Sequence, residues 1–269
     1  MSGAVKAEFR KYFTTRMWWG MAIGVFLAGA LLAVFFALVV AGSTSQGQPG
    51  QSSAPVPGLD NTSMVSTVYT GGLSIAYLLT LTVGVMAIGS EYRHKTITST
   101  FLSTPRRVRL MLAKVTSLLG IGAAYGLVFL VGSVGVGGAT IAVKGFSPIP
   151  EAGPIARTLA LSLLVLGLWS LIGLGFGILI PNQVAAILIA VGAAWILEPL
   201  LAFGLAFASW GRPIVPYLPS QATSAMVGQI NTSDTVTLLS WWAGALVLVA
   251  YAAVLAGIGS YLTVRRDVT

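Results

Sequence analysis

The sequence predicts an all-α integral membrane protein in which residues 1–269 form a single transmembrane domain of six helices. Apolar residues make up 56% of the chain and charged residues only 8%, so most of the folded surface must face hydrocarbon. Crossing a hydrocarbon core of about 30 Å takes about 20 apolar residues in a helix. Lipid offers the backbone no hydrogen-bond partners, so the spans should be helical. The apolar runs cover residues 17–42, 64–90, 110–143, 154–180, 184–208 and 238–262.

Basic residues set the predicted orientation, with both termini in the cytoplasm. If the N-terminus lies inside, twelve of the fifteen Lys and Arg residues fall on the cytoplasmic side, and only Lys144, Arg157 and Arg212 fall outside. This asymmetry is the positive-inside pattern, which five or seven spans would scramble. The net charge of +8 is thereby explained by membrane topology, and nucleic acid is not expected as a partner. We expect a multi-pass protein of the plasma (cytoplasmic) membrane.

Residue usage argues against an enzyme. The chain has no cysteine and a single histidine, His94, which excludes disulfides, thiolate metal sites and histidine-based catalytic triads. An intramembrane enzyme needs convergent catalytic groups within its spans, and the spans contain no histidine and no acidic pair. We therefore predict no catalytic residue and no metal site.

Residues 1–16 predict an amphipathic interface helix. Its apolar side chains recur at i, i+4, i+7 and i+8, at Val5, Phe9, Tyr12 and Phe13. Lys6, Arg10 and Lys11 interleave on the other side. Such a helix is suited to the inner membrane surface, with its basic residues toward lipid phosphates. The alternative is a solvated, positively charged tail.

The second span is unusually rich in hydroxyl groups for a membrane helix. These groups either bond back to their own and neighbouring helices or line an amphipathic pathway. We predict the pathway, which suits drugs, peptides or lipids better than highly charged solutes. The candidate lining residues are Tyr69, Ser74, Tyr77 and Thr80, with Trp195, Glu198 and Phe203 from the fifth span.

The turn between the second and third spans is the most charged stretch of the chain. We expect it to begin as an extension of the second helix and to end where Thr104 caps a new helix, with Pro105 at its first position. Ile97, Phe101 and Leu102 would share one face. An apolar knob presented to the cytoplasm needs a cover, which is either a partner protein or the inner leaflet.

Three segments together resemble the permeases of ABC-2-type transporters. The segment between the second and third helices is similar in Glu91-Tyr92-Arg93, Lys95-Thr96, Phe101-Leu102-Ser103-Thr104-Pro105 and Lys114. The start of the chain is similar to the interface helix of this family in Glu8-Phe9-Arg10-Lys11, and the later part in Glu198-Pro199-Leu200 and Tyr217-Leu218-Pro219. The resemblance covers the chain in length and helix count, and it is strongest to actinobacterial-type members whose ATPase is a separate polypeptide.

The resemblance implies an exporter subunit that works by alternating access at a dimer interface. The sequence has no phosphate-loop motif, so ATP and Mg²⁺ would be bound by a separate ATPase subunit. In similar permeases the cytoplasmic turn and the N-terminal helix dock on that ATPase. The contact candidates are Glu91, Arg93, Thr96, Phe101, Leu102 and Pro105. A second copy of the chain, or a related permease, would complete the transporter.

Glu198 is the only acidic residue inside a predicted span. A charge at the bilayer centre costs about 3 kcal/mol on insertion scales, so it needs a reason. Pro199 beside it removes a backbone donor and favours a helix break. Three interpretations stay open: a helix-end carboxylate before a short re-entrant segment, a structural pair with Arg157, or a contact with substrate or with a coupling proton.

Two other functions compete with an ATP-driven exporter. A secondary transporter would be driven by an ion gradient, and such proteins usually show paired intramembrane charges or helices broken at mid-depth. A non-transporting immunity or scaffold protein would use the same six spans without a pathway.

Overall fold

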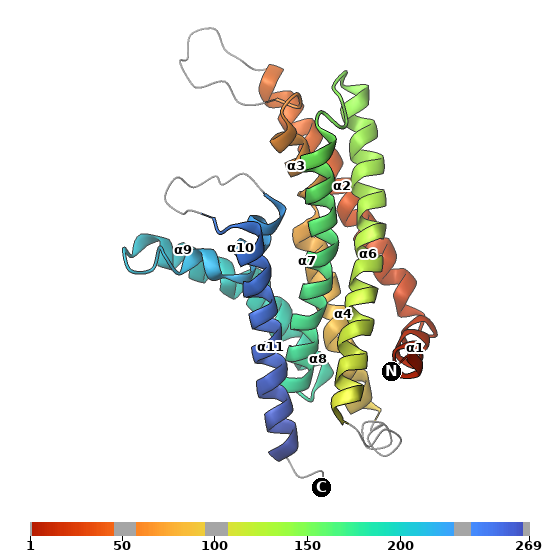
Figure 1. Ribbon diagram of the computed structural model, residues 1–269. Coiled ribbons are helices and arrows are strands. Elements are labelled where there is room, and N and C mark those ends of the chain that lie inside the picture. Colours follow the sequence, from red (N-terminus) through yellow and green to blue (C-terminus); the bar gives the residue numbers. More distant parts are fainter. Residues whose placement is uncertain (1, 46–57, 95–106, 229–237, 266–269) are drawn as a thin grey trace.

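The computed structural model describes residues 2–45, 58–94, 107–228 and 238–265, and these residues form an elongated helical bundle without a strand (Figure 1). The α-helices are α1 (Ser2–Phe13), α2 (Met17–Ser45), α3 (Thr62–Thr70), α4 (Leu73–Arg93), α6 (Arg107–Val143), α7 (Ala152–Leu179), α8 (Gln183–Gly192), α9 (Glu198–Phe207), α10 (Pro219–Val227) and α11 (Trp241–Arg265). A π-helix, η1 (Ala193–Leu197), joins α8 to α9, and a 3₁₀ turn, η2 (Val215–Tyr217), precedes α10.

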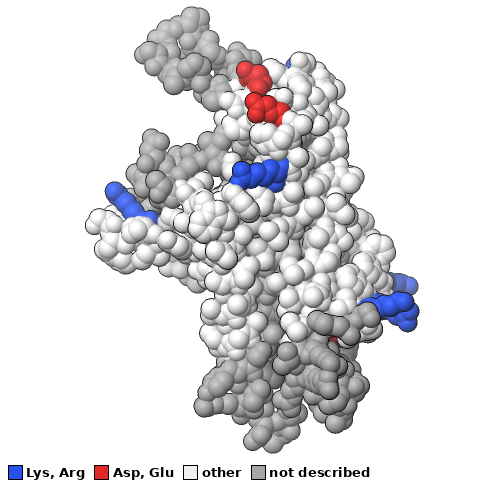
Figure 2. Space-filling view, in the orientation of Figure 1, with Lys and Arg blue, Asp and Glu red and all other residues white. Residues whose placement is uncertain are grey.

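Six segments in this described part are long and apolar enough to cross a membrane, which confirms the predicted multi-pass architecture. They cover Met17–Gly42, Thr62–Arg93, Met111–Val143, Ala152–Leu179, Gln183–Phe207 and Trp241–Ile258. Figure 2 agrees with this assignment, because the charged side chains on the visible face lie in its upper part and at its lower right edge, and a wide uncharged band separates them.

Helix α7 forms the centre of the bundle and packs against α4, α6 and α11, while α2 packs on α6 (Figure 1). Two glycines allow α4 and α7 to approach very closely. A Cβ atom on Gly84 would lie 1.9 Å from the Ser170 carbonyl oxygen, and one on Gly173 would lie 2.0 Å from the Leu81 carbonyl oxygen. The two backbones are therefore in direct contact, which no larger residue permits.

The second span is broken rather than continuous, which corrects the single helix expected over residues 64–90. Helix α3 ends at Thr70 and α4 begins at Leu73, so Gly71 and Gly72 separate them. A Cβ atom on Gly72 would lie 2.2 Å from the Ala28 carbonyl oxygen of α2, and one on Gly71 would meet the Phe36 ring. The break therefore lies where the second span is in direct contact with the first.

The fifth segment bends in its middle, at the point within residues 184–208 where Pro199 was expected to favour a helix break. The bend combines η1 with Pro199, and both features are known causes of kinks because each removes regular helical hydrogen bonds. Beyond it α9 leaves the bundle at a steep angle to α8 (Figure 1). Its apolar side chains are largely exposed, Leu200 to 63% and Phe203 to 68%, which suits contact with hydrocarbon.

Helix α10 was not predicted from the sequence. It follows the proline-rich segment after α9 and packs against both α7 and α11. The chain therefore runs outward along α9 and then returns to the bundle before the last span begins. This excursion places Glu198 of α9 beside the first turn of α10.

Candidate functional site at the base of the bundle

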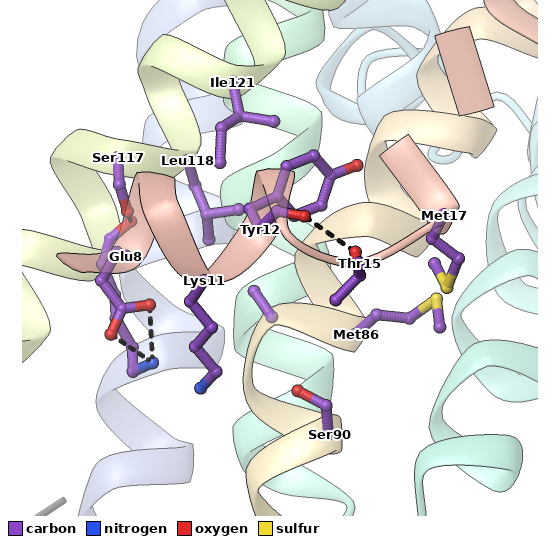
Figure 3. A pocket seen from close by; sticks show the side chains of 12 residues that line it. Glu8, Lys11, Tyr12, Thr15, Met17, Met86, Ser90, Ser117, Leu118 and Ile121 are labelled. Atoms are coloured by element: carbon purple, nitrogen blue, oxygen red, sulfur yellow. Dashed lines mark hydrogen bonds and ion pairs between the residues drawn. The ribbon is translucent and has the colours of Figure 1, made fainter. Parts of the chain in front are cut away.

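Helix α1 crosses the base of the bundle and packs against α6 (Figure 3). Phe9 and Tyr12 supply the apolar contacts to the main hydrophobic core. Gly120 on α6 makes room for Phe9, since a Cβ atom at that position would lie 2.7 Å from the Cζ atom of the ring. The predicted amphipathic helix is therefore present, but its apolar face packs at least partly on protein.

A cluster of four charged side chains fastens α1 to α4 and α6. Lys114 Nζ lies 2.6 Å from Glu91 Oε1 and 3.1 Å from both carboxylate oxygens of Glu8. Lys11 Nζ lies 2.5 Å from the same Glu91 oxygen. We refer to Glu8, Lys11, Glu91 and Lys114 as the ion cluster. It joins two residues of α1 to one residue of α4 and one of α6.

The inner half of the ion cluster is almost completely removed from solvent. The side chains of Glu91 and Lys114 are 2% and 1% exposed, while Lys11 is 45% exposed. Two carboxylates and two ammonium groups give the cluster a net charge of zero. A buried charge is tolerated when it is paired in this way, and removing one partner leaves the other uncompensated. The cluster therefore makes the position of α1 depend on α4 and α6 together.

A chain of hydroxyl groups adds a second connection. The Tyr12 hydroxyl lies 2.5 Å from the Tyr125 hydroxyl of α6, which in turn donates to the Trp18 carbonyl oxygen at 2.9 Å. Because Tyr125 donates to Trp18, Tyr12 is the donor to Tyr125. Burial, and then the bond to Tyr125, raise the pKa of Tyr12 well above its ordinary value. Tyr12 therefore stays neutral and keeps its proton for this hydrogen bond.

A small cavity of about 100 Å³ lies between α1, α4 and α6, next to the ion cluster (Figure 3). Met17, Met86, Leu118 and Ile121 form its apolar part, and Ser90 and Ser117 add hydroxyl groups. At this site three helices meet around charges that balance one another.

The residues predicted to contact an ATPase fall into three groups. Glu91 is buried within the ion cluster, so in this conformation its carboxylate faces the protein. Arg93 is exposed at the last position of α4. Thr96, Phe101, Leu102 and Pro105 lie outside the described residues, as does the predicted cap at Thr104. Helix α6 begins at Arg107, seven residues before Lys114, or about 10 Å at helical rise.

The three interface-helix candidates have different surroundings in the structure. Phe9 is packed on the core and Arg10 is exposed, as an amphipathic helix requires. Lys11 was expected to point toward lipid phosphates, but it binds Glu91 instead. Sequence reasoning missed the ion cluster; the only available signals were that Glu91 and Lys114 lie on either side of one turn and that Glu8 is the single acidic residue of α1.

The residues predicted to line a substrate path do not gather in one cavity. Tyr69 is buried and donates to the Pro148 carbonyl oxygen at 2.7 Å, and Thr80 bonds back to the Tyr77 carbonyl oxygen of its own helix. Ser74, Trp195 and Phe203 lie on the outside of the bundle. The hydroxyl groups of Tyr69 and Thr80 therefore satisfy protein backbone, which is the alternative that the sequence left open.

Glu198 acts as a cap for a helix other than its own. Its Oε1 atom accepts a hydrogen bond from the Ser220 backbone N–H at 2.5 Å, in the first turn of α10, where the N-cap residue Leu218 has no side-chain acceptor. Arg157, weighed as an ion-pair partner, lies instead over the ring of Trp241, 5.1 Å from its centroid. The proposed Glu198–Arg157 pair is therefore wrong, and the carboxylate compensates a helix N-terminus.

Comparison with known proteins adds no family assignment. No protein-family model matches the sequence, and a search of the curated proteins gives no match.

Proposed function

We propose that this chain is the permease subunit of an ATP-driven ABC-2-type transporter whose ATPase is a separate chain. The ion cluster is the observation that carries the proposal. Glu8, Lys11, Glu91 and Lys114 belong to the segments through which the sequence resembles these permeases, and they meet at distances of 2.5 to 3.1 Å. Residues from two of the three segments that carry the resemblance thus come together in one cluster, which supports the proposal.

The ion cluster gives this function a mechanical basis. A partner that binds the turn between α4 and α6 would displace the ends of both helices. Breaking a buried ion pair costs about 3–5 kcal/mol, so α1 would move with α4 and α6 rather than separate from them. The close contact of Gly84 and Gly173 would pass the movement on to α7 at the centre of the bundle.

The remaining parts of the proposal follow from the charge distribution and the family resemblance. The base of the bundle, with α1 and both termini, faces the cytoplasm of a plasma membrane, and two permease chains form the transport pathway. ATP and Mg²⁺ act on the partner subunit. Transport of an amphipathic or hydrophobic substrate requires that its affinity differ between the two states of the pathway.

The proposal is tested by co-expressing the chain with a phosphate-loop ATPase encoded beside it and purifying the complex through a tag on this chain. We expect the double substitution Phe101→Asp and Leu102→Asp to abolish co-purification, because it places two charges on the predicted apolar knob. Ile149→Asp is the matched control, since Ile149 is 52% exposed at the opposite end of the bundle. A complex that survives the double substitution contradicts the docking assignment.

Ion-gradient-driven transport is a second candidate, favoured by the position of Glu198. This buried carboxylate lies where the fifth segment is interrupted by a π-helix and a proline, and broken helices mark the binding sites of many secondary transporters. Purified chain in liposomes separates the alternatives. Uptake that follows an ion gradient without an ATPase supports this second candidate, and no transport under either condition supports an immunity or scaffold role.

A further inference from the structure

A lateral cavity of about 220 Å³ lies beside Glu198, away from the ion cluster. Its walls come from α4, α7, α8, η1, α9, α11 and the start of α10. Leu197 and Leu201 line it and are themselves 54% and 46% exposed on the outside of the bundle. The cavity therefore opens sideways, toward the region that hydrocarbon occupies, and a ligand dissolved in the membrane has direct access to it.

Glu198 brings an acidic side chain to this apolar cavity. The residue is 6% exposed, and one of its oxygens accepts the Ser220 N–H at the N-terminus of α10. Burial disfavours the charged form of this carboxylate, whereas the donor at the helix N-terminus and a bound cation both favour it. Within the described residues every ion pair belongs to the ion cluster, so Glu198 has no basic partner there. An unpaired charge in surroundings of low polarity attracts a cation more strongly than one in water.

Aromatic rings complete the recognition chemistry. Trp169, Phe176 and Tyr251 line the same cavity as Glu198. Trp169 is held in place because its Nε1–H donates to Thr223 Oγ1 at 2.8 Å, and its ring stacks on Tyr77 with centroids 4.0 Å apart. Aromatic rings attract ammonium groups by cation–π interactions, and the attraction grows when the site excludes water.

We propose that this cavity binds compact hydrophobic cations, with Glu198 as the counter-charge and the aromatic rings as the walls. A cavity of about 150 Å³ is known to accept benzene, so the volume here suits a single ring that carries a small ammonium group. A hydrophobic anion would be repelled by Glu198. The inference rests on the proposed function only in that it names the substrate class of the transporter; the binding itself needs no ATPase.

The test is calorimetric titration of the purified, detergent-solubilised chain with benzyltrimethylammonium. Its neutral isostere neopentylbenzene and the anion benzoate serve as comparison ligands. We expect the cation to bind, and Glu198→Gln to weaken its binding about tenfold or more, because the amide removes the charge that a desolvated cation needs. Glutamine keeps an acceptor oxygen for the Ser220 N–H, so the cap on α10 is preserved.

Two further variants keep the experiment decisive. Glu151→Gln, which changes an exposed acidic residue near the start of α7, should leave cation binding unchanged. Ala194→Leu adds volume at the cavity wall without touching the charge, and it should also weaken binding. If Glu198→Gln unfolds, as judged by its melting temperature, the comparison of benzyltrimethylammonium with neopentylbenzene on wild type decides whether a charge is recognised, and Ala194→Leu decides whether this cavity is the site.

The proposal is overturned if benzyltrimethylammonium does not bind, if it binds wild type and a folded Glu198→Gln equally, or if neopentylbenzene and the cation are affected alike. Glu198 would then be a helix cap only. This failure is distinct from failure of the proposed function, because co-purification with the ATPase depends on the opposite region of the chain. A chain that binds the cation but no ATPase would keep the site and lose the ATP-driven mechanism.

Discussion

Glu91 on α4 and Lys114 on α6 bury opposite charges against each other, with 2.6 Å between the Lys114 ammonium nitrogen and the nearer carboxylate oxygen. The two residues enclose the turn between the second and third spans, and both also hold α1 through Lys11 and Glu8. The pair therefore links the end of α4 and the first part of α6 to α1. Its energetics are the first property to measure.

Glu91→Gln should destabilise the chain by about 3 kcal/mol, because it leaves Lys114 buried with only the more distant Glu8 as a counter-charge. The double variant Glu91→Gln with Lys114→Met should recover most of that loss, since a buried pair replaced by neutral groups is often close to neutral in stability. Thermal unfolding in detergent measures both. Equal melting temperatures for wild type and Glu91→Gln would show that the cluster is solvated and not structural.

Gly84→Ala should disrupt the contact between α4 and α7, because the added methyl group would lie 1.9 Å from the Ser170 carbonyl oxygen and must force the helices apart. We expect a loss of about 1–3 kcal/mol or more, as for other overpacked cores. Gly192→Ala is the matched control, since a Cβ atom there meets nothing within 4 Å. It should be neutral or stabilising, because alanine favours a helix by about 1 kcal/mol over glycine. Size-exclusion profiles and melting temperatures compare the two.

Tyr125→Phe should cost more stability than Tyr12→Phe. Removing the Tyr125 hydroxyl takes the partner from both the Trp18 carbonyl oxygen and the Tyr12 hydroxyl, whereas removing that of Tyr12 leaves the bond to Trp18 intact. A single hydrogen bond contributes about 0.5–1.5 kcal/mol. Denaturant titration should rank the two variants in this order, and the reverse order would contradict the assigned donor directions.

Tyr12 also predicts a change at alkaline pH. Its folded-state pKa is raised above its ordinary value of about 10 by burial, so the stability contributed by the neutral phenol is present below pH 10. It is lost as the pH rises above 10, because the unfolded chain then releases the proton more readily. Stability measured from pH 8 to 11 should fall less steeply in Tyr12→Phe than in wild type. Parallel slopes would mean that Tyr12 is hydrated in the folded state.

The natural absence of cysteine makes the predicted orientation directly testable. Phe101→Cys should react with an impermeant maleimide only from the cytoplasmic side, and Ile149→Cys only from the outside, because an odd number of spans separates the two positions. Inside-out and right-side-out vesicles provide the two conditions. Labelling of position 101 from the exterior would reverse the orientation and remove the proposed ATPase docking surface.

The spans were predictable because each requires a long apolar run, and no soluble arrangement could hide so many. The break in the second span was not predictable in the same way. Gly71-Gly72 interrupts this span where a Cβ atom would meet α2, and the sequence does not contain that contact. Pairs of glycines four residues apart, which can mark close helix crossings, were equally uninformative. With 32 glycines in 269 residues, such pairs arise by chance.

The candidate sites were likewise predictable only in part. Glu198 was singled out because a carboxylate in an apolar run is costly. Its partner, however, is a backbone N–H of α10, a helix that was not expected directly after a proline-rich segment. The ion cluster was missed because its members are 80 and 106 residues apart and each looked like an ordinary basic or acidic residue near a membrane surface. Long-range pairing of charges is a property of the packed helices, not of any local pattern.

The separation of the cluster residues along the chain has a consequence for biosynthesis. A ribosome adds about 5–20 residues per second, so roughly 4 to 21 s pass between the synthesis of α1 and that of the residues that hold it. During this interval nascent α1 can bind only to the membrane surface, and its basic face suits this binding. Helix α1 can therefore pack against both α4 and α6 only after the third span has been inserted. In a nascent chain that stalls earlier, α1 lacks these packing partners.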